Sequence, residues 1–177
     1  MGKWLVVYSS VTGNTKKVAE AIAAAAGEAD VASIDKAPED LSGYEAVAVG
    51  YWLWRGGPDP KTAAWLPNVQ NTAVVFFETH AAEPKSEHAI TAFARAAYRL
   101  GAGCRVLATF GCQGQVSPSI LAKRQKMTPD NPHAKASGWK TAAGHPDVND
   151  LSAAAAFVVK VKQKIVLLKK FAPPAEQ

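Results

Sequence analysis

The chain has 177 residues, of which 48% are hydrophobic and 20% charged, and its formal net charge is +5. This length predicts one domain spanning residues 1–177, with a core large enough to need no disulfides. No apolar run reaches the roughly 20 residues of a membrane-spanning helix, and the first residues match neither a secretory signal nor the myristoylation pattern. We therefore expect a cytoplasmic protein without a transmembrane segment.

The first elements predicted are a strand over 3–8, a polar turn, and a helix over 13–26. A buried strand that leads through such a turn into a helix can bind phosphate, because the first-turn N–H groups are unpaired and the helix dipole favours an anion. Gly13 lets the backbone approach closely. The turn contains no lysine or arginine and no Walker pattern, which favours a mononucleotide phosphate over a triphosphate with magnesium. Three hydroxyls can donate to that phosphate: Ser10, Thr12 and Thr15.

Four further strands and three further long helices are predicted: strands over 30–35, 45–51, 72–78 and 103–111, and helices over 60–66, 86–101 and 150–170. The apolar runs at 46–49 and 73–77 are typical of parallel strands buried on both faces. Alternating strands and helices predict an α/β fold: a doubly wound, five-stranded parallel sheet with helices on both faces. Cys104 and Cys112 fall on one predicted strand, about 26 Å apart, and so are too distant for a disulfide.

Residues 113–149 interrupt this alternation with four prolines. We expect a short helix near 118–127 and then an irregular excursion, which is either a lid or docking surface or an insertion without a role. The last helix, over about 150–170, has an apolar side that packs on the sheet. It also carries the charge excess, because residues 151–177 contain five lysines and one glutamate. This basic helix either docks an acidic partner or is a solvated face, and weak alternation at 158–161 leaves a strand open.

The turn Ser10-x-Thr12-Gly13-Asn14-Thr15 resembles the phosphate loop of flavodoxins. The order of strands and helices is also similar to flavodoxin over about residues 3–112. This resemblance implies the strand order 2-1-3-4-5, which puts the ligand where strands 1 and 3 lie side by side. It also implies bound FMN, with the phosphate held by Ser9, Ser10, Thr12, Gly13, Asn14 and Thr15. The alternative is an ordinary turn whose Ser and Thr residues cap the helix.

In this resemblance, two loops hold the flavin ring. The first runs from Gly50 to Gly57, where Trp52 and Trp54 are the candidates for stacking on the ring or, alternatively, cover the end of the sheet. In flavodoxins a peptide flip in this loop lets a backbone carbonyl accept the N5 proton of the flavin semiquinone. The resemblance implies that Gly56 or Gly57 permits this flip. Arg55 near the ring would stabilise the anionic reduced form and make the second reduction step less negative.

The second loop, 78–84, offers four candidates for the pyrimidine edge of the flavin: Thr79, His80, Ala81 and Ala82. His80 either donates a proton to the flavin or is a solvated loop histidine. This loop has no aromatic residue, so the outer face of the ring is open or is covered by Trp139. At the end of the fifth strand, Cys112 either contacts the flavin or is a small buried hydrophobe.

The resemblance implies an FMN-binding electron-transfer protein that shuttles electrons between redox partner proteins. The main alternative is an FMN-dependent reductase of a quinone, tetrapyrrole or similar flat acceptor, and a third is a flavin-free interaction module with the same fold. No metal is expected, because the four histidines show no ligand spacing. No nucleic acid is expected either, because the lysines at 160–170 lack a recognised motif.

Overall fold

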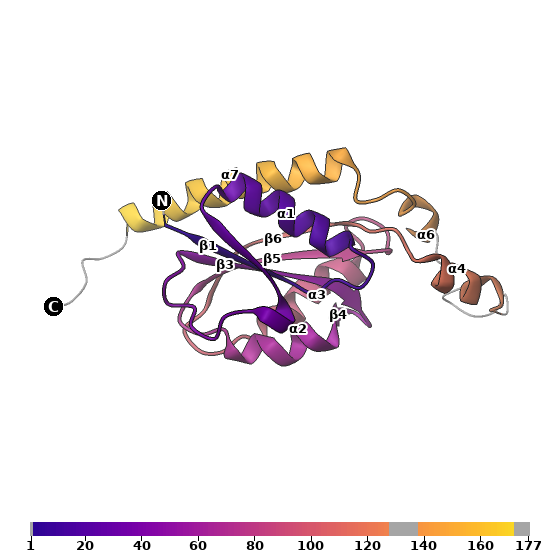
Figure 1. Ribbon diagram of the computed structural model, residues 1–177, viewed down its shortest axis with the longest axis horizontal. Coiled ribbons are helices and arrows are strands. Elements are labelled where there is room, and N and C mark those ends of the chain that lie inside the picture. Colours follow the sequence, from indigo (N-terminus) through magenta and orange to yellow (C-terminus); the bar gives the residue numbers. More distant parts are fainter. Residues whose placement is uncertain (1, 128–137, 172–177) are drawn as a thin grey trace.

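The structure is a computed structural model that describes residues 2–127 and 138–171. Five parallel strands form the central sheet in the order β2-β1-β3-β5-β6 (Figure 1). Their bounds are β1 Trp4–Tyr8, β2 Ala29–Ser33, β3 Ala46–Trp54, β5 Ala73–His80 and β6 Arg105–Gln113. A two-residue strand, β4 (Gly57–Pro58), pairs antiparallel with β3. The predicted doubly wound sheet is therefore confirmed, and its parallel strands follow the predicted order 2-1-3-4-5.

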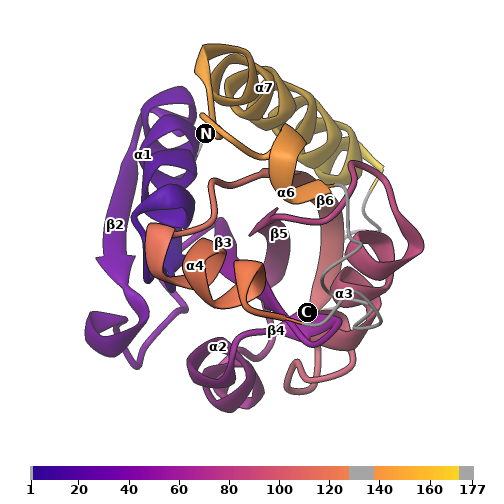
Figure 2. The ribbon, with the colours of Figure 1, turned by 90° about the vertical axis from the view of Figure 1, so that its right-hand side faces the viewer.

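Helices cover both faces of this sheet, as predicted. Figure 2 shows α1 and α7 on one side of the sheet and α2 and α3 on the other. None of the helices in the described ranges combines the length and apolarity that crossing a membrane requires. The bounds are α1 Asn14–Ala26, α2 Pro60–Trp65, α3 Glu87–Ala97, α4 Pro118–Gln125, α6 Gly138–Thr141 and α7 Val148–Lys170, with 3₁₀ turns η1 Ile34–Lys36 and η2 Leu66–Asn68.

Each face of the sheet buries its own apolar core. The inner strands β1, β3 and β5 are mostly apolar because alternate side chains point to opposite faces and both faces are covered. The edge strands β2 and β6 also contain polar and exposed residues. The core under α1 and α7 includes Val6, Ala48 and Phe77. The core under α2 and α3 includes Val7, Val49 and Phe76. The inner strands are thus fixed between two apolar layers.

The last helix follows its predicted pattern. Four side chains at helical spacing are buried against the sheet: Ala154, Val158, Val161 and Ile165. The strand alternative at 158–161 is therefore wrong. Asp147 begins α7 in a capping box, since its side chain accepts from the N–H groups of Asn149 and Asp150. The middle of the predicted excursion, residues 128–137 with His133, lies outside the described residues.

Three strands extend beyond their predicted ends: β3, β5 and β6, the last of which runs to Gln113 instead of 111. β3 continues to Trp54, because Leu53 and Trp54 pair with Pro58 and Gly57 of β4 in a tight hairpin. β5 continues to His80, which pairs with Gln113 of β6. Cys104 lies just before β6 and Cys112 lies within it, and both thiols are free.

Gly50 is the position in the sheet where a side chain would fit worst. It is buried in β3, and an added Cβ would lie 2.1 Å from the ring of Phe77 on β5. We expect Gly50→Ala to lower the free energy of unfolding by about 1–3 kcal/mol, because the packed ring has no room to move. Urea denaturation measures this loss.

Two further variants make this test specific. Gly43→Ala is the matched control, because no atom lies within 4 Å of its added Cβ, and it should leave the urea midpoint nearly unchanged. In the double variant Gly50→Ala/Phe77→Leu the smaller side chain makes room, so its destabilisation should be less than the sum of the two single losses. Additive losses would show that the contact is not the cause.

Candidate functional site

The carboxyl ends of the parallel strands bring four loops together at one edge of the sheet. The loops follow β1, β3, β5 and β6, whose order reverses between β1 and β3. Such a switch point is where open α/β sheets bind ligands, because neighbouring loops diverge there and leave a crevice. The residues predicted for the site come from these four loops, so the fold brings together segments that lie far apart in the sequence.

The turn after β1 contains a row of unpaired backbone donors. Gly13 has a φ of 87° and precedes α1, whose amino end has no side-chain cap. Within the described residues, no N–H group from Thr12 to Thr15 donates a hydrogen bond, while the Lys16 N–H donates to Ser10 Oγ at 3.3 Å. Unpaired N–H groups at the positive end of a helix attract an anion. The turn therefore has the donors that a phosphate requires.

Three side chains of this turn hold it to its neighbours. Ser9 Oγ donates to Asp59 Oδ1 at 2.9 Å, and Asn14 Nδ2 donates to the Gln115 carbonyl at 2.9 Å. The hydroxyls of Thr15 and Thr79 lie 2.9 Å apart in a buried hydrogen bond. These three side chains position the loop. The hydroxyls of Ser10 and Thr12 therefore remain as the candidates for donating to a phosphate.

Asp59 is a site residue that the sequence analysis missed. It is 1% exposed. Besides holding Ser9, it caps α2 by accepting from Lys61 N at 3.1 Å and from the Thr62 hydroxyl at 2.8 Å. An Asp-Pro pair ahead of a helix is a recognisable cap. Its contact with the β1 turn, 50 residues away in the chain, has no local signal.

The hairpin after β3 carries the predicted ring-stacking residues. The rings of Trp52 and Trp54 meet edge to face at 5.3 Å. Trp52 is half-buried, and its Nε1–H has no acceptor in the part of the chain that the structure describes. Trp54 is 43% exposed, and the Arg55 guanidinium lies 5.2 Å from its ring centre. The hairpin can therefore offer the exposed aromatic face of Trp54 to a flat ligand, whereas the Trp52 Nε1–H is buried within the protein.

The tip of this hairpin is held in place by a side chain of α3. Arg55 and Gly56 both have positive φ values, 49° and 79°, and a Cβ on Gly56 would lie 2.8 Å from Arg95 Nη1. Arg95 of α3 donates from Nη1 to the Arg55 carbonyl at 3.1 Å. The positive φ of Gly56 thus favours glycine at this position, and a larger side chain would also have to displace the Arg95 guanidinium.

The end of β5 was predicted to belong to a polar loop, but it is a buried strand. His80 is 6% exposed, so the expectation of a solvated loop histidine is wrong. Its Nδ1 lies 3.1 Å from the Ala82 carbonyl, and only a protonated Nδ1 can donate to that oxygen. Burial lowers the pKa of His80, which keeps the ring neutral near pH 7. The proton on His80 Nδ1 is therefore bound to the Ala82 carbonyl of the loop after β5.

Cys112 lies on β6 opposite Thr79, within the core under α7. It is 7% exposed. Burial, followed by the nearby Asp150 charge, raises the pKa of its thiol well above the usual value. The thiol is therefore protonated and a poor nucleophile, as expected of a small buried hydrophobe.

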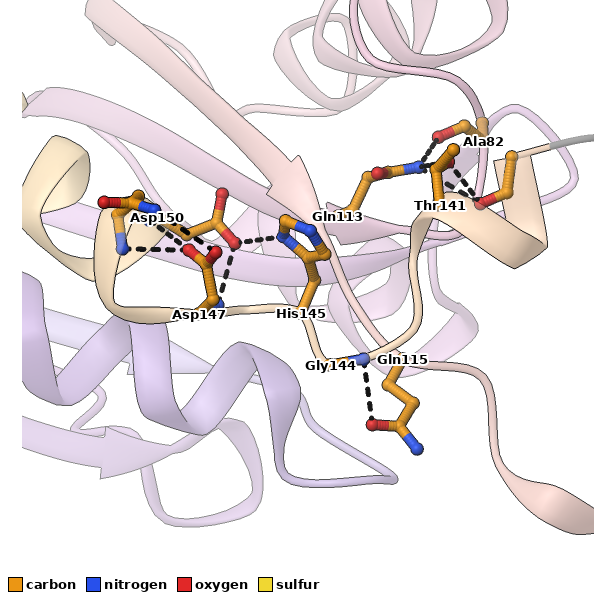
Figure 3. A network of polar contacts seen from close by, with 10 residues as sticks. Ala82, Gln113, Gln115, Thr141, Gly144, His145, Asp147 and Asp150 are labelled. Atoms are coloured by element: carbon orange, nitrogen blue, oxygen red, sulfur yellow. Dashed lines mark hydrogen bonds and ion pairs between the residues drawn. The ribbon is translucent and has the colours of Figure 1, made fainter.

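The described ends of the excursion are bound to the site loops (Figure 3). The Gln113 side-chain amide donates to Ala82 O at 2.9 Å and to Thr141 Oγ1 at 2.9 Å. A Cβ on Gly138 would lie 2.6 Å from the Ala81 carbonyl, so the backbone of α6 packs directly on the loop after β5. This brings the half-buried Trp139 of α6 to that loop.

Figure 3 also shows His145, Asp147 and Asp150, whose ligand atoms all lie within 4.8 Å of one another. The sequence spacing did not suggest this group. His145 Nδ1 lies 2.5 Å from Asp150 Oδ2, which also accepts from the Asp147 N–H at 2.9 Å. Hydrogen bonds from the first turn of α7 lower the pKa of Asp147. Helix capping thus accounts for this group.

Glu78 is the second residue that the sequence analysis missed. It is fully buried on β5 and pairs in register with the fully buried Tyr51 of β3. No hydrogen bond of standard geometry reaches either Glu78 oxygen or the Tyr51 hydroxyl from the described part of the chain, although Tyr51 is close enough to lower the pKa of Glu78 against the larger effect of burial. Burial raises the pKa of Glu78 to about 8. An acidic residue directly after the apolar run 73–77 was the available signal.

Comparison with known proteins identifies the family. The sequence model of the flavodoxin domain matches residues 5–159. This chain belongs to the flavodoxin family. It is 29% identical over 175 residues to the flavodoxin-like domain-containing protein BilS of Clostridioides difficile (strain CD3), an alignment that covers 93% of this chain and 99% of the relative.

Two solved structures share the flavodoxin fold with this chain. Flavodoxin 2 of Bacillus cereus has a TM-score of 0.60 and 18% identity, covering 92% of this chain and 99% of its own. A flavoprotein of Lactobacillus acidophilus, solved in complex with FMN, has a TM-score of 0.50 and 18% identity, covering 70% and 98%.

The buried Glu78 predicts a pH-dependent stability. Its folded pKa of about 8 lies above its ordinary value of 4.5, so the proton is held more tightly in the folded state. The stability from this group is complete below about pH 4.5 and is lost as the pH rises through about 8. We expect the free energy of unfolding to fall over this range with a slope of up to about 1.4 kcal/mol per pH unit.

Chemical denaturation at several pH values measures this slope. Glu78→Gln should flatten it, because the amide cannot ionise. Glu39→Gln removes an exposed carboxyl and should keep the slope of the unmodified protein. Equal slopes for the unmodified protein and Glu78→Gln would contradict the assignment.

Proposed function

We propose that this protein binds FMN non-covalently at the carboxyl edge of its sheet and carries electrons between redox partner proteins in the cytoplasm. The observation that carries the proposal is the row of unpaired N–H groups from Thr12 to Thr15 at the amino end of α1. It lies at the switch point of the sheet, beside an aromatic hairpin. Membership of the flavodoxin family supports the same ligand.

Phosphate binding falls to the turn after β1. The N–H groups of Thr12 to Thr15, with the hydroxyls of Ser10 and Thr12, would surround the phosphate. Ser9 and Thr15 act as positioning residues, because their hydroxyls bind Asp59 and Thr79. Asn14 does the same through Gln115.

Ring binding falls to the loops after β3 and β5. The exposed face of Trp54 suits stacking on a flat aromatic ligand. Arg55 adds a positive charge that would make the second reduction step less negative. The backbone from Thr79 to Ala82 would face the ring edge. FMN, when bound, supplies the redox chemistry.

The side chains at this edge favour a carrier over an enzyme. The His80 proton is committed to Ala82 O, and burial keeps the Cys112 thiol protonated, so neither is poised to transfer a proton to a substrate. A reductase of a quinone, tetrapyrrole or other flat acceptor is the second candidate. The 43% exposure of Trp54 supports it, since an open aromatic face can stack on such an acceptor.

The phosphate loop is tested by adding a negative charge to it. Thr12 is exposed in the turn, so Thr12→Asp should fold normally yet repel the phosphate. We expect FMN affinity to fall at least about tenfold, equal to about 1.4 kcal/mol, while riboflavin, which lacks the phosphate, keeps its affinity. Titration of flavin fluorescence measures both ligands.

Ser152→Asp is the matched control, because it adds the same charge at an exposed position of α7. It should bind both flavins as the unmodified protein does. If Thr12→Asp weakens riboflavin and FMN equally, the turn does not hold the phosphate.

Stepwise anaerobic reduction distinguishes the two candidate functions. If the protein is an electron carrier, its bound FMN should change its visible spectrum in two one-electron stages, and NAD(P)H alone should not reduce it rapidly. A single two-electron stage with rapid oxidation of NAD(P)H would favour the reductase. No binding of FMN at all would refute both and leave the flavin-free interaction module.

A further inference from the structure

Three of the five lysines of the C-terminal helix α7 bind acceptor groups of the same molecule. Lys162 donates to the Ala26 carbonyl at 2.7 Å, at the carboxyl end of α1, and Lys164 donates to the Leu107 carbonyl at 2.5 Å. Lys169 binds Glu45 at 2.5 Å. These lysines tie α7 to α1, to β6 and to the segment before β3, so α7 is a weaker candidate for docking an acidic partner than its lysine count suggests.

A second basic surface lies on the opposite side of the sheet. A groove of about 570 Å³ runs between the β3–β4 hairpin, α2 and α3. Three arginines and two aromatic residues line it: Arg55, Arg95, Arg99, Trp54 and Tyr98. We refer to these five residues and the groove between them as the arginine groove.

The arginines of this groove have no carboxylate partner. Arg55, Arg95 and Arg99 are all exposed, and none forms an ion pair with an acidic side chain in residues 2–127 or 138–171. By contrast, Lys3, Lys61 and Lys169 each bind a carboxylate. The groove thus concentrates positive charge that the described chain does not neutralise.

The solvent side of α3 next to the groove is also apolar where a surface helix is usually polar. Ile90 is 58% exposed and Tyr98 is 91% exposed, with the exposed Ala94 between them at helical spacing. Together with Trp54, these residues give the surface large apolar contacts beside positive charge. Trp, Tyr and Arg are the residues that contribute most binding energy at protein interfaces.

We propose that the arginine groove docks an acidic segment of a redox partner protein; this inference rests on the proposed electron-carrier function. Guanidinium groups bind carboxylates in paired hydrogen bonds, and the aromatic side chains supply apolar contact between them. An open groove with exposed walls suits a protein segment better than a small ligand, which is usually enclosed.

The position of the groove connects docking to the site. Arg95 binds the carbonyl of Arg55 in the hairpin, and the same hairpin carries Trp52 and Trp54. A partner seated in the arginine groove therefore contacts the outer side of the loop proposed to hold the flavin ring. This arrangement brings the partner next to the redox centre without covering the phosphate loop.

The test uses the full chain labelled with ¹⁵N and loaded with FMN. The probe is a capped peptide that alternates glutamate with leucine, and a lysine–leucine peptide is its counterpart. We expect the glutamate peptide to shift the amide signals of 54–57 and 94–99, with an affinity that falls as salt rises, and the lysine peptide to shift neither. Arg99→Glu should weaken peptide binding about tenfold or more.

Lys160→Glu is the matched control, because it makes the same charge change at an exposed position of α7. It should bind the peptide as the unmodified protein does. Shifts centred on α7, equal weakening in both variants, or no shift at the groove would overturn the proposal. Citrate or phosphate reproducing the same saturable shifts would also overturn it, by assigning the groove to a small anion.

The visible absorbance of bound FMN, recorded for each variant, separates the two proposals. Arg99→Glu should keep its FMN, since Arg99 belongs to neither flavin loop. If the unmodified protein binds the peptide but no FMN, the carrier function fails while the groove still docks an acidic segment. If it binds FMN but not the peptide, only the docking proposal fails.

Discussion

The parallel pairing of β1 with β3 is the constraint on which the rest of the site depends. Tyr8 pairs with Gly50 in this register, and the next N–H, that of Ser9, donates to the Gly50 carbonyl at 2.9 Å. The pairing puts the polar turn of β1 beside the aromatic hairpin of β3, at the switch point of the sheet. On its other side Gly50 pairs with Phe77 of β5, whose ring occupies the space that a Cβ would need.

Hydrogen bonds between the loops then fix the positions of the residues at this edge of the sheet without a ligand. Ser9 binds Asp59, Thr15 binds Thr79, and Gln113 binds both the loop after β5 and α6. Each bond joins segments that belong to different strands. Such preorganisation lowers the entropy lost on binding. It also explains why several polar residues of the site are fully occupied within the protein, while the unpaired groups are backbone donors of one turn.

The sequence predicted the features that depend on a local pattern of residues. It did not predict the features that depend on contacts between segments far apart in the chain. Apolar runs identified the strands, and the glycine-containing turn identified the open end of α1. The burial of His80 was missed because it depends on β5 continuing beside β6. The role of Gln113 and the link from Asp59 to Ser9 join distant segments and leave no local signal. Charge counting likewise pointed to the lysines of α7, whereas the structure binds several of them internally and leaves the three arginines of the arginine groove exposed.

Amide spectra of the ¹⁵N-labelled protein, recorded with FMN and with riboflavin, test the central claim most directly. The claim is that the unpaired N–H groups from Thr12 to Thr15 bind the phosphate of a flavin. A hydrogen bond to phosphate moves an amide proton downfield, so the account predicts large downfield shifts of these four signals with FMN and not with riboflavin. Signals of the turn that stay in place when FMN binds, or that move equally with riboflavin, would contradict it.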